Sequence, residues 1–206
     1  MNITQWTERV HNRADIVTRL THLTRATESM DALEVLVKIL EDKRLIGSTT
    51  QSGYIVGNTP AVCLQETPLE ALAAHIRYEN ESFGQIDKCD VRYSGIGIRF
   101  NKVFVYRSGG RPVIYDKTEY LKSILPEEQY WRIVNFDLDN NENCIDWTHE
   151  REWRVPNELV FDYDKIELIF PTDEVYRRFV SYCEENNKIH IMKEIHGILI
   201  LSSIVS

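Results

Sequence analysis

Acid, base and aromatic side chains are densest in residues 146–155, whose sequence is DWTHEREWRV. If this run is a strand, its side chains alternate between two faces. Glu150, Glu152 and Arg154 then share one face, and Trp153 points to the other. A face with two carboxylates and a guanidinium is costly to bury unless its charges are paired. The pattern therefore predicts a rigid strand that presents two acids to a cleft while its other face packs on the core.

Two carboxylates two residues apart suit chemistry at a glycosidic bond. Such a bond breaks through an oxocarbenium-like transition state, which one carboxylate stabilises while the second activates the incoming nucleophile. The alternative is an exposed strand face on which the glutamates pair with Arg151, with Arg154 or with a neighbouring strand. Spacing alone leaves both interpretations open.

Length, composition and charge restrict the class of protein. The chain has 206 residues, a formal charge of −8 and 43% hydrophobic residues, which indicates one domain with a sizeable core. No run reaches the roughly 18 to 20 apolar residues of a membrane span, and the first residues lack the features of a signal peptide. The four cysteines are scattered without a metal-binding spacing, as in a reduced protein. We therefore expect a cytoplasmic protein without membrane contact.

The acidic balance also argues against broad electrostatic binding to nucleic acid. Lys102, Arg107 and Arg111 gather around one predicted turn and are candidates for a local basic patch. A solvated hairpin end is the alternative explanation for these three cations.

Residue periodicity predicts a mixed α+β chain with helices early and strands concentrated late. The predicted helices cover residues 4–14, 29–43, 67–78, 117–125, 127–134 and 172–186. The predicted strands cover 16–24, 61–64, 93–100, 102–106, 112–115, 146–155, 165–170 and 195–205, and loops cover 47–60, 79–92 and 137–146. The phosphate-loop, dinucleotide-binding, GxSxG and HExxH motifs are missing from the sequence.

The order of three segments suggests a family. A strand with the run LTHLT (20–24) precedes a helix and a glycine-containing loop, a strand-rich middle follows, and the Glu-x-Glu of residues 150–152 comes late. This plan resembles the ADP-ribosyltransferase fold, an α+β split β-sandwich with flanking helices. The opening is similar to that of DarT-type nucleic-acid ADP-ribosyltransferase toxins.

Other segments resemble AbiGi-like abortive-infection proteins of phage defence. They are VCLQETPL (62–69), His75, Tyr93, GIGIRFNK (95–102), GRPVIY (110–115) and HEREWR (149–154). Together the two resemblances cover about residues 16–160 and imply one ADP-ribosyltransferase-like domain over residues 1–206.

The resemblance implies roles for particular residues in binding NAD. Glu152 would be the catalytic glutamate, which bonds the nicotinamide ribose and stabilises the oxocarbenium ion, and Glu150 would position or activate the acceptor. His22 and Thr24 would hold the adenosine side or the ribose of NAD. Residues 137–149 would form the substrate-recognition loop. Without this context, a histidine on a strand is more often a core residue than a ligand, and the Glu-x-Glu run makes the two interpretations of His22 about even.

The arginine that DarT-type enzymes carry soon after a glycine-rich loop has three candidates here, Arg25, Arg44 and Arg99. Tyr106 and Tyr115 are candidates for stacking on nicotinamide or a base, or for filling the core.

The sequence therefore leads us to expect a toxin or anti-phage effector that transfers ADP-ribose from NAD to RNA or DNA. A non-catalytic module of a toxin–antitoxin or phage-defence system, bound to an antitoxin or chaperone, is the alternative. A metal-dependent nuclease that uses Asp137, Asp139, Asp146 and Glu150 is a third hypothesis, although no known acid/Lys motif supports it.

Overall fold

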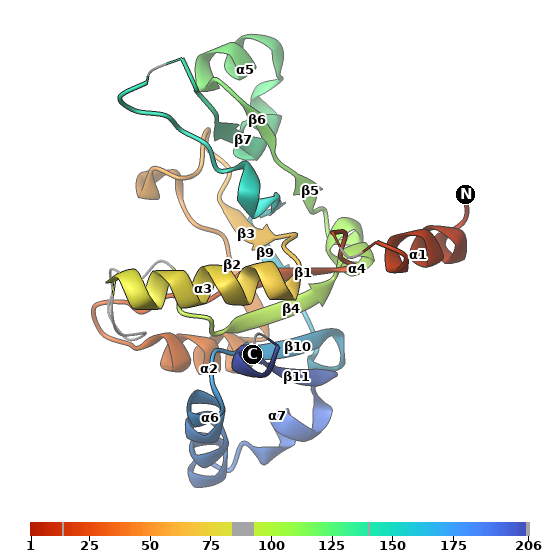
Figure 1. The fold of residues 1–206 in the computed structure, drawn as a ribbon, viewed down its shortest axis with the longest axis vertical. Helices are drawn as coiled ribbons and strands as arrows, with labels where there is room; N and C mark the ends of the chain where they lie inside the picture. The colour runs from red at the N-terminus through yellow and green to blue at the C-terminus, as the bar shows by residue number, and fades with distance from the viewer. Residues whose placement is uncertain (14, 84–92, 140, 205–206) are drawn as a thin grey trace.

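The computed structural model describes residues 1–13, 15–83, 93–139 and 141–204, and it has an α+β fold built on a seven-stranded mixed sheet (Figure 1). The strand order is β11-β10-β4-β1-β3-β8-β5. β10 and β11 are parallel, and the other neighbours are antiparallel. The strands are β1 Arg19–Leu23, β3 Ala61–Gln65, β4 Gly97–Asn101, β5 Arg111–Pro112, β8 Glu152–Pro156, β10 Ile166–Phe170 and β11 Gly197–Ile200.

Two short ribbons flank this sheet. β2 (Arg44–Ile46) pairs antiparallel with β9 (Glu158–Val160), and β6 (Ile114–Asp116) pairs parallel with β7 (Ile133–Asn135). The β6–β7 ribbon and helix α5 (Thr118–Ile124) form a small lobe at the top of Figure 1.

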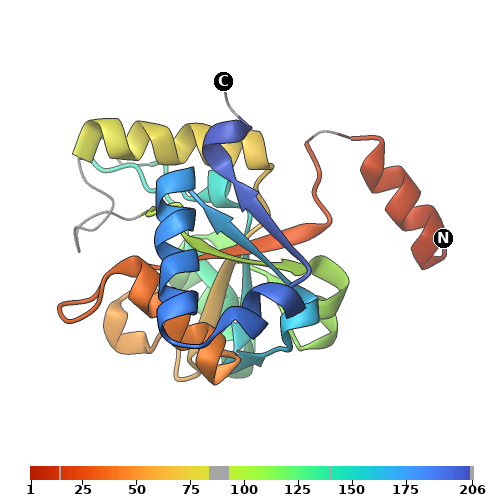
Figure 2. The same cartoon turned by 90° about the horizontal axis from the view of Figure 1, so that it is seen from below.

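Helices cover both faces of the sheet (Figure 2). α2 (Ala32–Asp42) and α6 (Asp173–Glu185) pack on the face of Leu20 and Leu168, and α3 (Leu69–Phe83) packs on the face of Ile169. The alternation of side chains along each strand explains why neighbouring residues join different core clusters. The shorter helices are α1 Ile3–His11, α4 Lys102–Arg107 and α7 Ile189–Glu194, and the 3₁₀ turns are η1 Thr50–Ser52, η2 Glu127–Arg132, η3 Thr148–Glu150, η4 Tyr163–Lys165 and η5 Leu201–Ser203.

The sheet is nearly divided between β1 and β3. β1 pairs with β4 from Arg19 to Leu23, and β3 pairs with β8 from Ala61 to Gln65. Between β1 and β3 the register pair is Thr21 with Gln65. The two halves of the sheet are therefore joined at this one register pair, and residues 21–24 and 63–65 line a gap beside it.

Gly97 allows β4 to approach β1 closely next to that gap. A Cβ atom at residue 97 would lie 2.2 Å from the carbonyl oxygen of His22. A glycine inside a strand often marks such a close approach, and at Gly97 the close neighbour is backbone.

Several predicted elements are confirmed with shifted ends. α1 begins after Asn2 instead of Thr4, because Asn2 and Gln5 form a capping box. α2 is capped by Asp31 instead of Ser29, and α3 continues to residue 83. The part of the predicted loop at 84–92 lies outside the described residues.

The predicted hairpin over residues 102–115 is wrong. Asn101 accepts hydrogen bonds from the amides of Val103 and Phe104, so it caps helix α4 where a strand was expected. The predicted helix over 127–134 is a 3₁₀ turn followed by β7, and β2, β9 and α7 were not predicted. These short strands form through pairing with distant residues, which local propensity does not encode.

Candidate active site at the divided sheet

A cavity of about 590 Å³ lies at the gap between β1 and β3. Its walls come from β1, β2, β3, β8, the turn η3 and helix α2, which covers one face of the sheet. The volume is in the usual range of small-molecule sites, which extends from about 300 to about 1,000 Å³. The cavity contains both glutamates of the Glu-x-Glu sequence.

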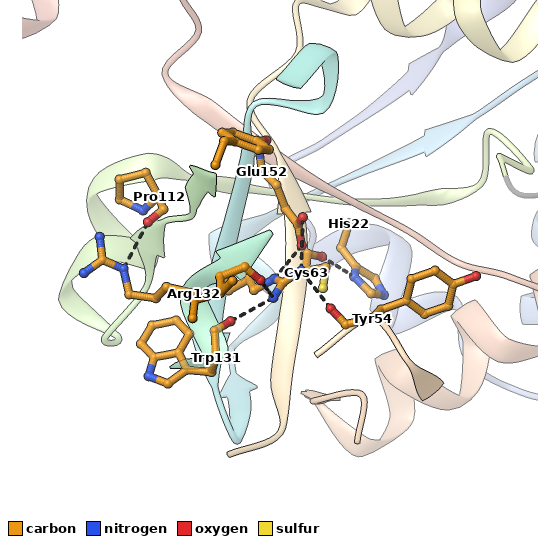
Figure 3. A network of polar contacts seen from close by, with 10 residues as sticks. His22, Tyr54, Cys63, Pro112, Trp131, Arg132 and Glu152 are labelled. Carbon is orange, nitrogen blue, oxygen red and sulfur yellow. Dashed lines mark hydrogen bonds and ion pairs between the residues drawn. The ribbon is translucent and has the colours of Figure 1, made fainter. Parts of the chain in front are cut away.

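Glu152 is fixed in this cavity by Arg154. Figure 3 shows the polar network around Glu152, in which His22, Cys63 and Tyr54 are labelled. Arg154 Nε lies 2.7 Å from Glu152 Oε1, and its Nη2 lies 3.4 Å from Oε2. The same guanidinium donates to the carbonyls of Trp131 (2.9 Å), Ile133 (3.0 Å) and Tyr54 (3.1 Å). Glu152 and Arg154 are 7% and 3% exposed. Burial by itself lowers the pKa of Arg154, but the neighbouring Glu152 carboxylate outweighs this and raises the pKa above its ordinary value.

Part of the strand prediction for residues 146–155 is confirmed. Glu152 and Arg154 share one face, and Trp153 is buried on the other. The placement of Glu150 on the same strand is wrong, because β8 begins only at Glu152. Glu150 lies on the turn η3, and Arg151 adopts the left-handed backbone conformation, with φ 46°, between the turn and the strand.

Glu150 nevertheless reaches the cavity. Its Oε1 accepts a hydrogen bond from the hydroxyl of Tyr93, and both residues line the cavity wall. The structure therefore brings the two glutamates to one cavity by a turn and a strand, instead of by strand alternation.

His22 lies across the gap from Cys63. Its Nδ1 lies 2.9 Å from the carbonyl oxygen of Cys63, on the strand that the gap separates from β1. Burial lowers the pKa of His22, so the imidazole is neutral at pH 7. A carbonyl accepts only, so Nδ1 carries the proton and Nε2 is left as an acceptor.

Cys63 also lines the cavity. Burial raises the pKa of this thiol, and the negative charge of Glu152 raises it further. Cys63 is therefore a protonated thiol at neutral pH and not an activated nucleophile.

Thr24 lines the cavity but its hydroxyl serves the fold. It donates to the carbonyl oxygens of Ala32 at 2.9 Å and Ile96 at 3.1 Å, and the residue is 2% exposed. The hydroxyl thereby ties the start of α2 to the end of β1.

Two of the three candidate arginines line the cavity. Arg25 and Arg44 are exposed there, together with Lys38 and the single carboxylate Asp42 from the α2 side. Arg44 lies 3.8 Å from Glu158, a distance typical of a weak, solvated pair. The α2 side of the cavity therefore carries more positive than negative charge.

Arg99 does not line the cavity. Its Nη1 lies 2.9 Å from Oε2 of Glu167, and Arg19 binds the other oxygen of that carboxylate at 2.9 Å. Burial lowers the pKa of Arg99, and the ion pair with Glu167 opposes that shift. Arg99 joins β4 to β10 and is not placed to contact a ligand in the cavity.

The two candidate tyrosines also lie outside the cavity lining. Tyr106 is half exposed on α4, and the guanidinium of Arg111 lies 4.0 Å from its ring centre. The Tyr115 hydroxyl accepts from the backbone amide of Glu152 at 2.9 Å, and burial raises its pKa to about 12. Tyr115 thus stabilises the first residue of β8 through its backbone amide and is not placed to contact a ligand in the cavity.

The carboxylates of the nuclease hypothesis already have partners within the protein. Asp137 and Asp139 both pair with Lys117, and Asp146 accepts from Thr148. Within the described ranges of the chain, no group of three or more His, Cys, Asp or Glu side chains is arranged to hold a metal ion.

Sequence reasoning missed Lys38, Asp42 and Tyr54 as cavity residues. The helix that carries Lys38 and Asp42 was predicted from its apolar residues, and these two polar residues lie on its outer side. Tyr54 lies in a loop, where no periodicity points to a cavity. Tyr93 was noted only as part of a resemblance, although an aromatic residue just before a glycine-containing strand was a usable signal.

Comparison with protein-family models, with curated proteins and with solved structures found no match for this chain. Among the helices that the structure describes, none has the length and apolar character required to cross a membrane. Function is therefore inferred from the chemistry of the cavity itself.

Proposed function

We propose that the chain is an NAD-dependent ADP-ribosyltransferase with an ADP-ribosyltransferase-like split sheet. The observation that carries this proposal is the buried Glu152 carboxylate, held by Arg154 in a cavity that also contains Glu150 and the neutral His22. The single register pair that joins β1 to β3 supports the same interpretation, because the resemblance implies a cleft between two small sheets.

The charge distribution in the cavity fits the parts of NAD. NAD has a cationic nicotinamide, two riboses and a diphosphate. Arg25, Lys38 and Arg44 on one side supply positive charge for the diphosphate, and the two carboxylates lie on the other side. His22 Nε2 is an acceptor for a ribose hydroxyl.

The reaction follows from the positions of the carboxylates. The bond between nicotinamide and ribose C1 breaks, and nicotinamide leaves with the electron pair. Positive charge then develops on the ribose, and the negative charge of Glu152 stabilises it. An acceptor hydroxyl or amine attacks C1 and loses its proton to Glu150.

Arg154 prepares Glu152 for this role. Its N–H groups are directed at backbone carbonyls and at the carboxylate, so Glu152 is held in one orientation. A charge that is already oriented before the reaction needs little reorganisation in the transition state.

A labelling experiment tests the proposal. Purified protein is incubated with NAD labelled in the adenylate part and with separate pools of RNA, DNA and cell protein. We expect label to enter the RNA or DNA pool. Label found only in protein would show that the acceptor is a protein and not a nucleic acid. Nicotinamide release without label in any pool would identify an NAD hydrolase.

A second candidate is a non-catalytic module that binds NAD or a related nucleotide as part of a toxin–antitoxin or phage-defence system. The pairing of both Glu152 oxygens with Arg154 favours it, since a carboxylate engaged in this way has less capacity to bond a ribose. Binding of NAD without nicotinamide release would support this module.

Growth of a host cell separates the same two candidates. Production of a transferase toxin arrests growth, and the arrest requires Glu152. Growth that is unaffected, together with stable binding to an antitoxin or chaperone, would point to the binding module.

A further inference from the structure

The second carboxylate of the cavity is held by a residue from another part of the fold. Glu150 lies on the 3₁₀ turn η3 and not on the strand, so backbone pairing does not fix its carboxylate relative to Glu152. The hydroxyl of Tyr93 donates to Glu150 Oε1. Thr67 adds a longer contact of 3.4 Å to the backbone carbonyl of Glu150.

Tyr93 is itself rigidly placed. It is 5% exposed and packs in the cluster of Leu72, Ala73 and Ile76 beneath α3. His75 meets its ring edge-on, with ring centres 4.6 Å apart and an interplanar angle of 76°. A ring packed on its face and its edge has a single orientation, so the direction of its hydroxyl is defined.

We infer that Tyr93 is a positioning residue that orients Glu150 toward the incoming acceptor. This inference rests on the proposed transferase function. The breaking of the nicotinamide bond depends on Glu152, whereas capture of the ribosyl cation depends on Glu150. Tyr93 therefore controls how much of the product is acceptor-linked ADP-ribose and how much is lost to water.

The substitution Tyr93→Phe isolates this role because it removes the hydroxyl and keeps the ring. A matched control is Tyr163→Phe. Tyr163 is also 5% exposed, and its hydroxyl donates to the carbonyl oxygen of Leu40 at 2.9 Å, outside the cavity lining. Both variants lose one buried hydrogen bond, so they should lose similar stability.

The experiment measures transfer of ADP-ribose and hydrolysis of NAD side by side in wild type, Tyr93→Phe, Glu150→Gln, the double variant and Tyr163→Phe. We expect Tyr93→Phe to lower the ratio of transfer to hydrolysis about tenfold without a change in KM for NAD. In the Glu150→Gln background, Tyr93→Phe should have no further effect on the ratio. Tyr163→Phe should leave the ratio unchanged.

Two results would overturn the inference and have different meanings. If the wild type turns over NAD, independent effects of Tyr93→Phe and Glu150→Gln on the ratio of transfer to hydrolysis would contradict the positioning role alone. Equal effects of Tyr93→Phe and Tyr163→Phe on this ratio would do the same. Absence of any NAD turnover in the wild type would overturn the transferase function and this role with it.

Discussion

Arg154 and Glu152 form a buried ion pair two residues apart on β8, with 2.7 Å between Nε and Oε1. The guanidinium also binds the carbonyls of Tyr54, Trp131 and Ile133, which belong to two other segments of the chain. One side chain thus fixes the candidate catalytic carboxylate and joins the cavity wall to the lobe that contains β7.

Replacing Arg154 by Ala should strongly destabilise the fold. The change leaves the buried Glu152 charge and three carbonyls without their donor, and removal of one partner of a buried pair costs about 3–5 kcal/mol. Urea unfolding measures the loss. Arg177→Ala, which removes an exposed pair with Asp173, is the control and should have a much smaller effect. Equal losses in the two variants would contradict the central position of Arg154.

The hydroxyl of Thr24 should matter for stability and not for ligand binding. Thr24→Val keeps the shape but leaves the carbonyl oxygen of Ala32 without this donor, which costs about 1–3 kcal/mol. Thr24→Ser keeps the hydroxyl and should retain most of the stability. Calorimetric titration with ADP-ribose should give the same affinity for folded Thr24→Val and wild type, whereas a folded Thr24→Val protein with much weaker binding than Thr24→Ser would restore the ligand role that the resemblance implied.

His22 should make the protein less stable in mild acid. Its pKa is lowered by burial from the ordinary 6.5, so the unfolded chain takes up a proton at a higher pH than the folded protein does. The stability from neutral His22 is complete above the unfolded pKa and is lost as the pH falls through the folded pKa. Urea unfolding between about pH 7.5 and about pH 5 should show a shallower pH dependence in His22→Gln than in wild type. The exposed His196→Gln is the control, and equal slopes in His22→Gln and wild type would contradict this assignment.

The cations on the α2 side should contribute to binding of the diphosphate. Lys38→Ala and Arg44→Ala should each weaken ADP-ribose binding about threefold to tenfold, or roughly 1 kcal/mol, because each removes one exposed positive charge. The affinity of these variants should also depend less on salt. Lys165→Ala, whose cation pairs with Asp164 outside the cavity lining, should bind as wild type does. Unchanged affinity of both cavity variants for ADP-ribose would show that its diphosphate does not bind at the α2 side of the cavity.

Sequence patterns predicted those parts of the structure whose conformation depends on residues close together in the chain. The apolar spacing of α2 and the threonine cap of α6 are local signals, and both helices lie where expected. The pairing of Arg154 with a glutamate was also predictable, because strand alternation places residues 152 and 154 on one face.

The structure differs from the sequence-based prediction where distant segments meet. Glu150 was placed on the strand because nothing local reports the left-handed backbone of Arg151. Arg99 was a ligand candidate because its partner Glu167 lies 68 residues away in the chain. Tyr115 supports the backbone of Glu152 through the fold of the β6–β7 lobe, and its sequence context gives no sign of that contact.

Nicotinamide release by the Glu152→Gln variant is the most direct test of the transferase function. The change keeps the shape of the side chain and removes its charge. Turnover should fall at least about a hundredfold while ADP-ribose binding persists, because the charge acts on the transition state. Glu167→Gln is the matched control, since Glu167 also pairs with arginines but lies outside the cavity lining, and it should retain activity. Full nicotinamide release by a folded Glu152→Gln protein would contradict the catalytic role of Glu152.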